Sequence, residues 1–493
     1  MRKSLFLIFL TLTILLTACQ RTELFAAPEN EYIVLNLKDE LAILKNGKPL
    51  DTRIAIPDSV KNYPTSSYQR RHGDYVYVIF GMDFCRIDTR DMSGEWYEGT
   101  MSRMSDDGTS FAYMTGEGLT VRGESWETFL TTVDTPRNAF SPDGNLMFCR
   151  DEKAHLHVIG MLNGENLDAD LGEFEGIAIS DNADFVYISR TDDEITELYL
   201  TSLKKPGSYL VDESALTHLG TVNDNIFVQY HYSADRSELL YLTNSAELIL
   251  LKNGENIELS SGKIDFLMRS EIFPYDPPRT FVGMPMLYHK PGQSNASLGM
   301  ITEQKDEITF VPLDDSDRLN AMAWMSGVQC PIITKSDFVW YTRFNDSDEY
   351  GYDLWRCKLV PGAKPELIEK DVSDYRVTDD GWAYCQHLTR SDRWWITASK
   401  PGKSSVEVDE EYWFERTAFK NTIFYSTIDY SYPIGERPRD LRSSEKGRPI
   451  KIVMSDIEDF SVHNTCVVVK KEIAGQTEYF ISTDGKHFNQ FFY

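Results

Sequence analysis

One short phrase recurs along the chain and limits what it can fold into. In each copy a polar residue and an Asp, often followed by Gly, precede a run of aromatic and β-branched residues. Asp-Gly between apolar runs is a hairpin signal, because Gly accepts a positive φ and the Asp carboxylate can bond nearby backbone amides. Each copy therefore predicts a strand, a turn and a returning strand. The copies begin at Ser105, Ser141, Ser180, Ser233, Ser336 and Thr378.

The glycines in the strongest copies have a specific predicted role. We expect Gly144 and Gly381 to adopt positive φ in hairpins that connect strands of one sheet. We also expect Asp143 and Asp380, which precede them, to accept hydrogen bonds from nearby amides. The glycines would then be structural rather than functional residues.

A second phrase supports the same repeat from another part of the unit. Residues 40–47 (Glu-Leu-Ala-Ile-Leu-Lys-Asn-Gly) recur almost unchanged as residues 247–254, and residues 161–167 are a weaker relative. Asn-Gly after an apolar run predicts a tight turn between two strands. The first phrase recurs after 36 residues between Ser105 and Ser141, near the ~40 to 45 residues of a four-stranded propeller blade. Helical periodicity is nearly absent.

Short strands at regular spacing in a chain of 493 residues favour radial repetition, since a single open sheet of so many strands would curl or expose its edges. The Ser-x-Asp-Gly-x-x-aromatic phrase resembles the repeat of TolB-like and dipeptidyl-peptidase-type propellers over about residues 31–493. The resemblance implies an all-β fold, a β-propeller of four-stranded blades. We expect about 7 to 10 blades of roughly 45 residues, in one ring or two. The interval from Ser180 to Ser233 and the absence of a clean copy in residues 260–335 leave the count open.

Two segments interrupt the repeat. The Pro-rich stretch Phe273–Arg279 is a candidate subdivision of the propeller domain, or a kinked loop between blades. The segment Tyr432–Arg442, followed by Lys446 and Arg448, is a basic patch on an acidic protein. It is either a solvated loop or a contact site, since loops often carry function.

The chain begins with a secretory signal. Arg2 and Lys3 precede the largely apolar run Leu5–Leu16, which is too short to span a bilayer core of ~30 Å. The following residues, Leu-Thr-Ala-Cys up to Cys19, resemble a bacterial lipobox. The resemblance implies cleavage before Cys19, lipid attachment to Cys19, a signal peptide over residues 1–18 and a lipidated tether over 19–30. It places the protein in the cell envelope, anchored to a membrane by lipid and facing outside the cytoplasm. An ordinary secretory signal with an incidental Cys19 is the alternative.

Charge excludes one class of partner. Removing Arg2 and Lys3 with the signal takes the formal net charge from −27 to −29, so nucleic acid would be repelled.

The six remaining cysteines form no CxxC pair and sit in apolar contexts, as at Cys149 and Cys385. We expect buried free thiols rather than disulfides, because a chain of this length can form a sufficient hydrophobic core without disulfide cross-links.

No motif for nucleophilic catalysis or phosphate binding is complete. A serine hydrolase elbow needs Gly-x-Ser-x-Gly, and both Gly123–Glu127 and Gly292–Ala296 lack the closing glycine. Gly402–Ser404 imitates the end of a phosphate-binding loop, but Thr397 stands where the first glycine should be. We therefore predict no catalytic residue and no cofactor.

Metal-ligand patterns are equally incomplete. His155 and His157 share one face of a strand, but sequence places no third ligand beside them. Residues 346–357 begin like a calcium loop, but the twelfth position is Cys357 instead of Glu. We predict a hairpin turn there and no metal site.

Adjacent aromatic residues occur at Trp394–Trp395 and Tyr412–Phe414. Neighbours on a strand face opposite sides, so both can lie in a propeller core, between blades. An exposed stacking platform for sugars or peptides is the alternative.

These features predict an exported, lipid-anchored β-propeller that acts as a non-catalytic binding or scaffold module for an envelope protein or polymer. The alternative is a propeller enzyme, a hydrolase or lyase, with scattered Asp, Glu and His gathered at the channel mouth. Titratable residues with perturbed pKa in one place would favour the enzyme. An exposed apolar patch would favour a partner surface.

Overall fold

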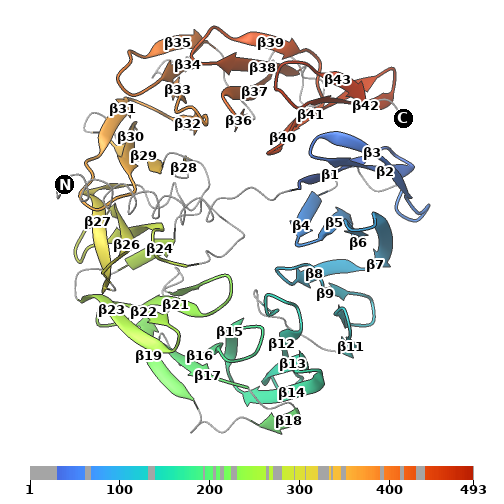
Figure 1. Cartoon of the computed structure of the whole chain (residues 1–493), viewed down its shortest axis with the longest axis vertical. Helices are drawn as coiled ribbons and strands as arrows, with labels where there is room; N and C mark the ends of the chain where they lie inside the picture. Colours follow the sequence, from blue (N-terminus) through green and yellow to red (C-terminus); the bar gives the residue numbers. More distant parts are fainter. Residues whose placement is uncertain are drawn as a thin grey trace, which may run out of the picture. The chain divides into compact units, whose positions relative to one another are not determined.

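The computed structural model describes residues 30–491 except for several internal segments. Within the described residues it contains 43 strands in eleven sheets and no α-helix (Figure 1). The predicted signal peptide, Cys19 and Cys330 lie outside the described residues. The internal segments left out are 62–67, 131–138, 193–194, 204–206, 211–215, 224–229, 262–265, 270–279, 294, 306, 320–331, 335–336, 346–350, 389–393, 411–415 and 429–438.

The predicted all-β propeller class is confirmed, and each sheet is one blade, numbered 1 to 11 here in chain order. Ten blades have four strands, whereas blade 1 has three in the described part of the chain. The predicted count of 7 to 10 blades is wrong. It assumed about 45 residues a blade, but tight hairpins let some blades close in fewer, as in the 36-residue interval from Ser105 to Ser141.

The chain forms two compact units. The first is built on residues 32–266 and holds blades 1 to 6, and the second is built on residues 282–493 and holds blades 8 to 11 with most of blade 7. The proposed subdivision at Phe273–Arg279 lies outside the described residues.

The first unit contains these strands. Blade 1 has β1 (Tyr32–Asn36), β2 (Glu40–Lys45) and β3 (Lys48–Ala55); blade 2 has β4 (Tyr68–His72), β5 (Tyr75–Phe80), β6 (Asp83–Asp88) and β7 (Ser93–Glu98); blade 3 has β8 (Thr100–Met104), β9 (Phe111–Met114), β10 (Leu119–Arg122) and β11 (Glu127–Leu130). Blade 4 has β12 (Leu146–Arg150), β13 (Leu156–Leu162), β14 (Glu165–Gly172) and β18 (Gly207–Leu210); blade 5 has β15 (Glu175–Ile179), β16 (Val186–Asp192), β17 (Ile195–Thr201) and β19 (Thr217–Asn223); blade 6 has β20 (Tyr230–Tyr232), β21 (Glu238–Leu242), β22 (Glu247–Lys252) and β23 (Glu255–Ser261).

The second unit continues the same pattern. Blade 7 has β24 (Phe266–Arg269), β25 (Pro285–His289), β26 (Ala296–Gln304) and β27 (Glu307–Leu319); blade 8 has β28 (Ile332–Ile333), β29 (Phe338–Phe344), β30 (Tyr352–Lys358) and β31 (Glu366–Glu369); blade 9 has β32 (Asp374–Val377), β33 (Ala383–Leu388), β34 (Trp394–Ser399) and β35 (Val406–Asp409). Blade 10 has β36 (Arg416–Phe419), β37 (Thr422–Ile428), β38 (Arg439–Glu445) and β39 (Lys451–Met454); blade 11 has β40 (Asp459–Val462), β41 (Val467–Ile473), β42 (Gln476–Ser482) and β43 (Asn489–Phe491).

One strand departs from the antiparallel order of the blades. After β17 of blade 5 the chain returns to blade 4, where β18 pairs in parallel with β14 from Leu167↔Gly207 to Asp170↔Leu210. Only then does β19 complete blade 5. This excursion lengthens the interval between the hairpin phrases at Ser180 and Ser233.

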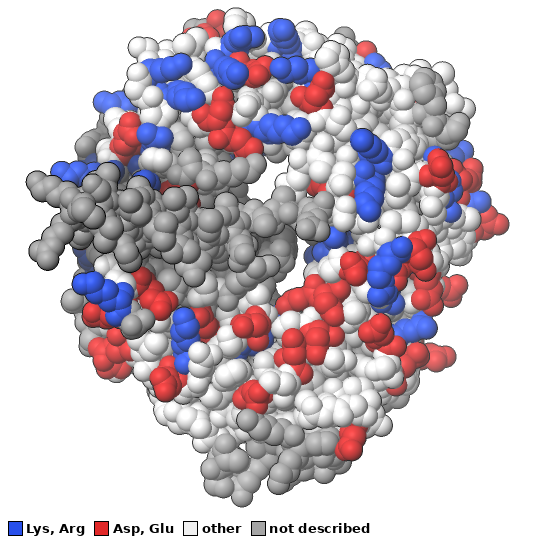
Figure 2. Space-filling model, in the orientation of Figure 1, with Lys and Arg blue, Asp and Glu red and all other residues white. Residues whose placement is uncertain are grey.

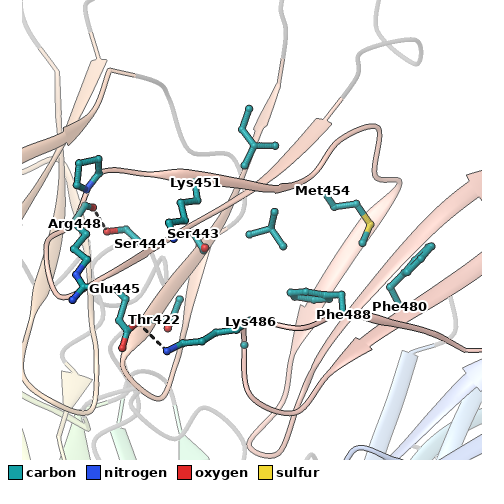
Figure 3. A pocket seen from close by; sticks show the side chains of 14 residues that line it. Thr422, Ser443, Ser444, Glu445, Arg448, Lys451, Met454, Phe480, Lys486 and Phe488 are labelled. Carbon is teal, nitrogen blue, oxygen red and sulfur yellow. Dashed lines mark hydrogen bonds and ion pairs between the residues drawn. The ribbon is translucent and has the colours of Figure 1, made fainter.

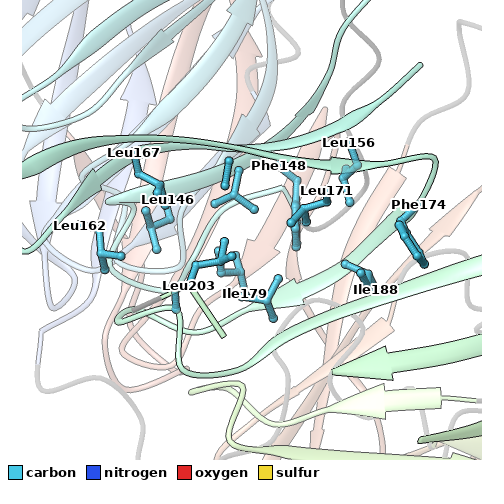
Figure 4. Close-up of a cluster of buried hydrophobic side chains, with 14 residues drawn as sticks. Leu146, Phe148, Leu156, Leu162, Leu167, Leu171, Phe174, Ile179, Ile188 and Leu203 are labelled. Carbon is cyan, nitrogen blue, oxygen red and sulfur yellow. The ribbon is translucent and has the colours of Figure 1, made fainter. Parts of the chain in front are cut away.

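The core lies between consecutive blades of each unit. Side chains alternate along a strand, and on β12 both sets are buried. Leu146 and Phe148 pack with Ile179 of blade 5 (Figure 4). Met147 packs with Ala112 of blade 3. This double burial explains why the strands read as continuous apolar runs. Burial of one such large side chain contributes about 1.5 to 3 kcal/mol.

The predicted glycine conformations are confirmed. Gly144 has φ 71° and Gly381 has φ 78°, each in the turn between two neighbouring strand segments of its blade. Asp143 Oδ1 accepts a hydrogen bond from the Asn145 amide at 3.0 Å, as expected. Asp380 differs, because it accepts from the Thr378 hydroxyl at 2.8 Å and from no amide among the described residues.

The copies without glycine keep the same turn. Ala183 (φ 53°) and Arg236 (φ 63°) take the glycine position with positive φ. In the copy predicted at Ser336, the assigned alignment is wrong: Asp337 has φ 59° and its amide donates to Thr334 O at 3.0 Å, so Asp337 replaces the glycine rather than the turn Asp. The hydrogen-bonding frame of the turn therefore imposes the left-handed conformation even on residues with a Cβ, for which it is unfavourable.

Candidate functional site

The first candidate site is formed by the hairpins of blades 3 to 6 in the first unit. The Thr109 hydroxyl donates to Asp143 O (3.1 Å), and the Asp143 amide donates to Asp181 Oδ1 (2.9 Å). Arg236 of blade 6 donates to Asp106 Oδ2 of blade 3 (2.8 Å). We call Asp106, Asp143, Asp181 and Arg236 the hairpin cluster.

A repeated hydrogen-bond frame positions these hairpins. In blade 4 the Ser141 hydroxyl donates to Asp143 Oδ1 at 2.7 Å and accepts from the Leu146 amide at 3.0 Å. The hydroxyls of Ser105 and Ser233 make the corresponding bonds in blades 3 and 6. The residue between the Ser and the Asp takes no part in this frame, and in blade 3 it is Asp106, which bonds to Arg236 in the hairpin of blade 6.

The hairpin cluster contains one carboxyl with an unusual pKa. Desolvation by the surrounding hairpins raises the pKa of Asp181 from 3.8 to about 6; the negative charge of Asp143 adds to this effect, and the positive charge of Arg236 opposes it. Acidic side chains also gather over β9 and β12 on the visible face of the first unit (Figure 2). Acidic residues outnumber basic residues by about two to one in residues 32–266, and by much less in 282–493.

The second candidate site is a pocket of about 580 Å³ between blades 10 and 11 of the second unit (Figure 3). One end is charged, and the other end is apolar. Thr422, Ser443 and Ser444 add hydroxyl groups to the charged end. We call this cavity the blade 10–11 pocket. Its charged end is formed by Glu445, Arg448, Lys451 and Lys486, and its apolar end by Met454, Phe480 and Phe488.

Positive charge exceeds negative charge at this pocket. Lys486 Nζ lies 3.2 Å from Glu445 Oε2. Arg448 and Lys451 line the same pocket and form no ion pair with another described residue. The pocket thus presents three cations and one carboxylate on a chain whose net charge is −27.

The apolar end continues onto the surface. Met454, Phe480 and Phe488 pack against the core cluster of blades 10 and 11. Ile452, between Lys451 and Met454 on β39, is 58% exposed. Ile452 thus extends the apolar lining of the pocket onto the surface.

The predicted basic patch is only partly available for binding. Residues 429–438 lie outside the described residues. Arg442 is paired with Asp409 at 3.0 Å, and Arg439 donates to Glu458 O at 3.4 Å. Of the predicted residues that the structure describes, Arg448 alone lines the blade 10–11 pocket. Lys451, Phe480 and Lys486 were not predicted, because no motif marks them and only blade packing brings them together.

The cysteines behave as predicted in the described part of the chain. Five are free and buried: Cys85, Cys149, Cys357, Cys385 and Cys466. Burial raises the pKa of Cys149 to about 12 and raises that of Cys385 well above its ordinary value. Such thiols are poor nucleophiles.

The predicted histidine pair is engaged by carboxylates. His155 Nδ1 lies 3.1 Å from Asp170, and His157 Nδ1 lies 3.0 Å from Asp168. No group of three or more His, Cys, Asp or Glu suited to a metal occurs among the described residues. The acidic segment 346–350 lies outside them.

The remaining sequence motifs have structural positions. Gly402 and Lys403 form the turn between β34 and β35, where the Lys403 amide donates to Lys400 O at 2.9 Å. Trp395 stacks on the buried His387 with ring centroids 4.9 Å apart. Tyr412–Phe414 lies outside the described residues. In the part of the chain that the structure describes, no helix is long and apolar enough to cross a membrane.

Comparison with known proteins gives no family. No protein-family model and no curated protein matches the chain. Among solved structures, PorZ, an essential surface component of the type-IX secretion system of Porphyromonas gingivalis, is 12% identical over 86% of this chain and 58% of PorZ, with a TM-score of 0.27. Dipeptidyl peptidase 4 of the same organism is 11% identical over 77% of this chain and 65% of that one, with a TM-score of 0.40.

The β-propeller domain of the Trilobed protease from Pyrococcus furiosus is 12% identical over 86% of this chain and 94% of that domain, with a TM-score of 0.27. The chain thus spans less than two thirds of both Porphyromonas proteins. Similarities of this size carry no argument about function, and the propeller class rests on the strand order of the blades themselves.

Proposed function

We propose that this protein is an exported, lipid-anchored β-propeller that acts as a non-catalytic binding or scaffold module for an envelope protein or polymer. The blade 10–11 pocket carries the binding part of the proposal. It joins an exposed apolar side chain, Ile452, to an excess of positive charge on an otherwise acidic chain. Apolar surface with charged groups at its border is typical of surfaces that bind partners.

The sequence supports the location. By the lipobox resemblance, Cys19 would receive a diacylglycerol on its thiol and become the new, acylated amino-terminal residue, with the propeller outside the cytoplasm. Strong acidity also favours a soluble body that does not adhere to anionic lipid head groups. Together these features describe a tethered module that presents its surfaces to the envelope.

Site-specific photo-crosslinking in cells tests the proposal. A photoreactive amino acid at Ile452 should give a discrete adduct, because this position borders the blade 10–11 pocket. The matched control is Val406, a strand residue of blade 9 that is 45% exposed and does not line the pocket. Adducts of equal yield at both positions, or none at Ile452, would contradict a partner at this surface. The mass of the adduct separates protein from polymer.

A second candidate function is a propeller hydrolase or lyase, and the raised pKa of Asp181 favours it. A carboxyl that titrates near neutral pH is suited to general acid or base catalysis. The test is turnover of model peptide, ester and glycoside substrates between pH 5 and 8. Turnover that Asp181→Asn abolishes, and that Glu165→Gln at the exposed start of β14 in blade 4 leaves unchanged, would support the enzyme over the binding module.

A further inference from the structure

We propose that the blade 10–11 pocket binds an extended, acidic peptide segment of a partner protein, which adds to the edge of β39. This inference rests on the proposed function and specifies the chemistry of the partner. Three features of the second unit support it: a sheet edge, an apolar end and a charged end.

The sheet edge is β39 itself. In the order β36-β37-β38-β39 it is the last strand of blade 10, so only β38 pairs with it in the described structure. Its pairing runs from Ser443↔Lys451 to Leu441↔Met454 and is interrupted by a bulge. The backbone groups on the other side of such a strand can hydrogen-bond to an added extended chain, which is a common mode of peptide recognition.

The apolar end offers a place for a side chain of that peptide. All four residues of β39 line the pocket, and so do Phe480 and Phe488 from blade 11 (Figure 3). Alternate side chains of an added strand would point toward the same side. One aliphatic or aromatic side chain of the peptide could therefore pack on Met454 and the two phenylalanines.

The charged end of the pocket favours a peptide with negative charge. Arg448, Lys451 and Lys486 line the pocket together with a single carboxylate, Glu445, which forms an ion pair with Lys486. A carboxylate beside Arg448 and Lys451 would gain charge-assisted hydrogen bonds, whereas a cationic residue would be repelled. Since the chain as a whole is strongly acidic, the pocket is a place where an acidic segment meets attraction.

Fluorescence anisotropy on the full-length protein in a neutral detergent tests this inference. The probe is a labelled hexapeptide of alternating Glu and Leu, and its control has Lys in place of Glu. We expect the Glu peptide to bind at least tenfold more tightly and to weaken with added salt. Lys451→Glu should weaken its binding roughly tenfold, as loss and reversal of one exposed ion pair predicts.

Matched variants separate the pocket from general effects. Lys358→Glu makes the same charge change as Lys451→Glu at an exposed position of blade 8. Ile452→Ser, which removes the exposed apolar group beside the pocket, should weaken binding, and Val406→Ser is its matched control on blade 9. Both controls should leave binding unchanged within twofold. Lys451→Glu should also gain affinity for the Lys peptide, a result that misfolding could not produce.

Three outcomes would overturn the inference. These are equal binding of the two peptides, equal losses in Lys451→Glu and Lys358→Glu, and binding of dodecyl phosphate or a sulfated polysaccharide at the pocket without binding of the Glu peptide. If Ile452 forms a crosslink in cells but the Glu peptide does not bind, only this inference is contradicted, and the proposed function stands. Absence of the crosslink would remove the proposed function as well.

Discussion

Arg236 in the hairpin of blade 6 donates a hydrogen bond to Asp106 in the hairpin of blade 3, with Nη2 and Oδ2 2.8 Å apart across 130 residues of sequence. The Arg236 side chain is almost wholly buried, and its Nη1 also donates to Ser233 O and Ala234 O. Its backbone has φ 63°, a conformation that is unusual for a bulky residue. A strained backbone is thus held in place by a guanidinium that ties two distant blades of the first unit together.

This relationship predicts unequal effects for its two partners. Arg236→Met should destabilise the protein by about 2 kcal/mol, because the partly buried Ala234 carbonyl loses its side-chain donor and the buried Ser233 carbonyl keeps only the backbone amide of residue 236. Asp106→Asn should cost about 1 kcal/mol or less, because Asp106 is half exposed and the backbone bonds of Arg236 persist. Urea denaturation measures both. Equal losses would contradict the view that the guanidinium acts mainly through the backbone of its own hairpin.

The hairpins show what sequence can predict here. The Ser-x-Asp-Gly phrase is local, and its hydrogen bonds close within six residues, so it predicted the turns at Gly144 and Gly381 correctly. It could not predict that the Arg236 side chain would reach Asp106, because that residue lies in another blade. The parallel pairing of β18 with β14 could not be predicted from the sequence either, because no local pattern encodes the partner of a strand.

The blade 10–11 pocket shows what sequence could not predict. Arg448 was singled out as part of a basic run, but most of that run is either paired, as is Arg442, or outside the described residues. Lys486 and Phe488 come from a turn more than thirty residues further on, near the end of the chain. Only the packing of blade 11 on blade 10 brings them beside Lys451.

Two glycines of the same phrase form a matched pair for separating strain from crowding. A Cβ at Gly381 would meet nothing within 4 Å, so Gly381→Ala should cost only the positive φ, about 1 kcal/mol. A Cβ at Gly144 would lie 2.7 Å from the Ser110 Cβ and 2.6 Å from its Oγ. Gly144→Ala should therefore cost clearly more, and Gly144→Val more again. Chemical denaturation gives the three values, and a smaller cost at Gly144 than at Gly381 would contradict the turn geometry.

The buried thiols should be inert in the folded protein. Burial raises the pKa of Cys357 to about 11 and that of Cys85 to about 12, so at pH 8 almost none of either is thiolate. We expect no iodoacetamide labelling of Cys85, Cys149, Cys357, Cys385 or Cys466 within an hour, and full labelling in guanidinium. Peptide mass spectrometry reads each site. Rapid labelling of one of them in the folded state, with the rest protected, would indicate an activated nucleophile and favour the enzyme.

The lipid anchor is tested at Cys19. More than one acyl chain on this residue would give stable membrane binding, since each buried methylene contributes about 0.8 kcal/mol. We expect Cys19→Ala to leave the membrane fraction or to remain unprocessed, whereas the conservative change Gln20→Asn at the next position should be processed normally. Fractionation and intact-mass measurement check both. A Cys19→Ala protein processed and membrane-bound like the wild type would rule out lipidation at this residue.

Asp181 should make stability depend on pH in a predictable direction. Its folded-state pKa of about 6 lies above the ordinary value of 3.8, so between these values the folded protein keeps a proton that the unfolded chain has lost. Stability must then fall as pH rises through this window. Asp181→Asn cannot ionise, yet it keeps an oxygen acceptor for the Asp143 amide. We expect the variant to exceed the wild type by on the order of 1 kcal/mol at pH 7.5, after allowance for solvent screening, and to match it near pH 4. Urea midpoints measured from pH 4 to 8 should diverge progressively, and a difference that stays constant with pH would show that Asp181 ionises freely in the folded state.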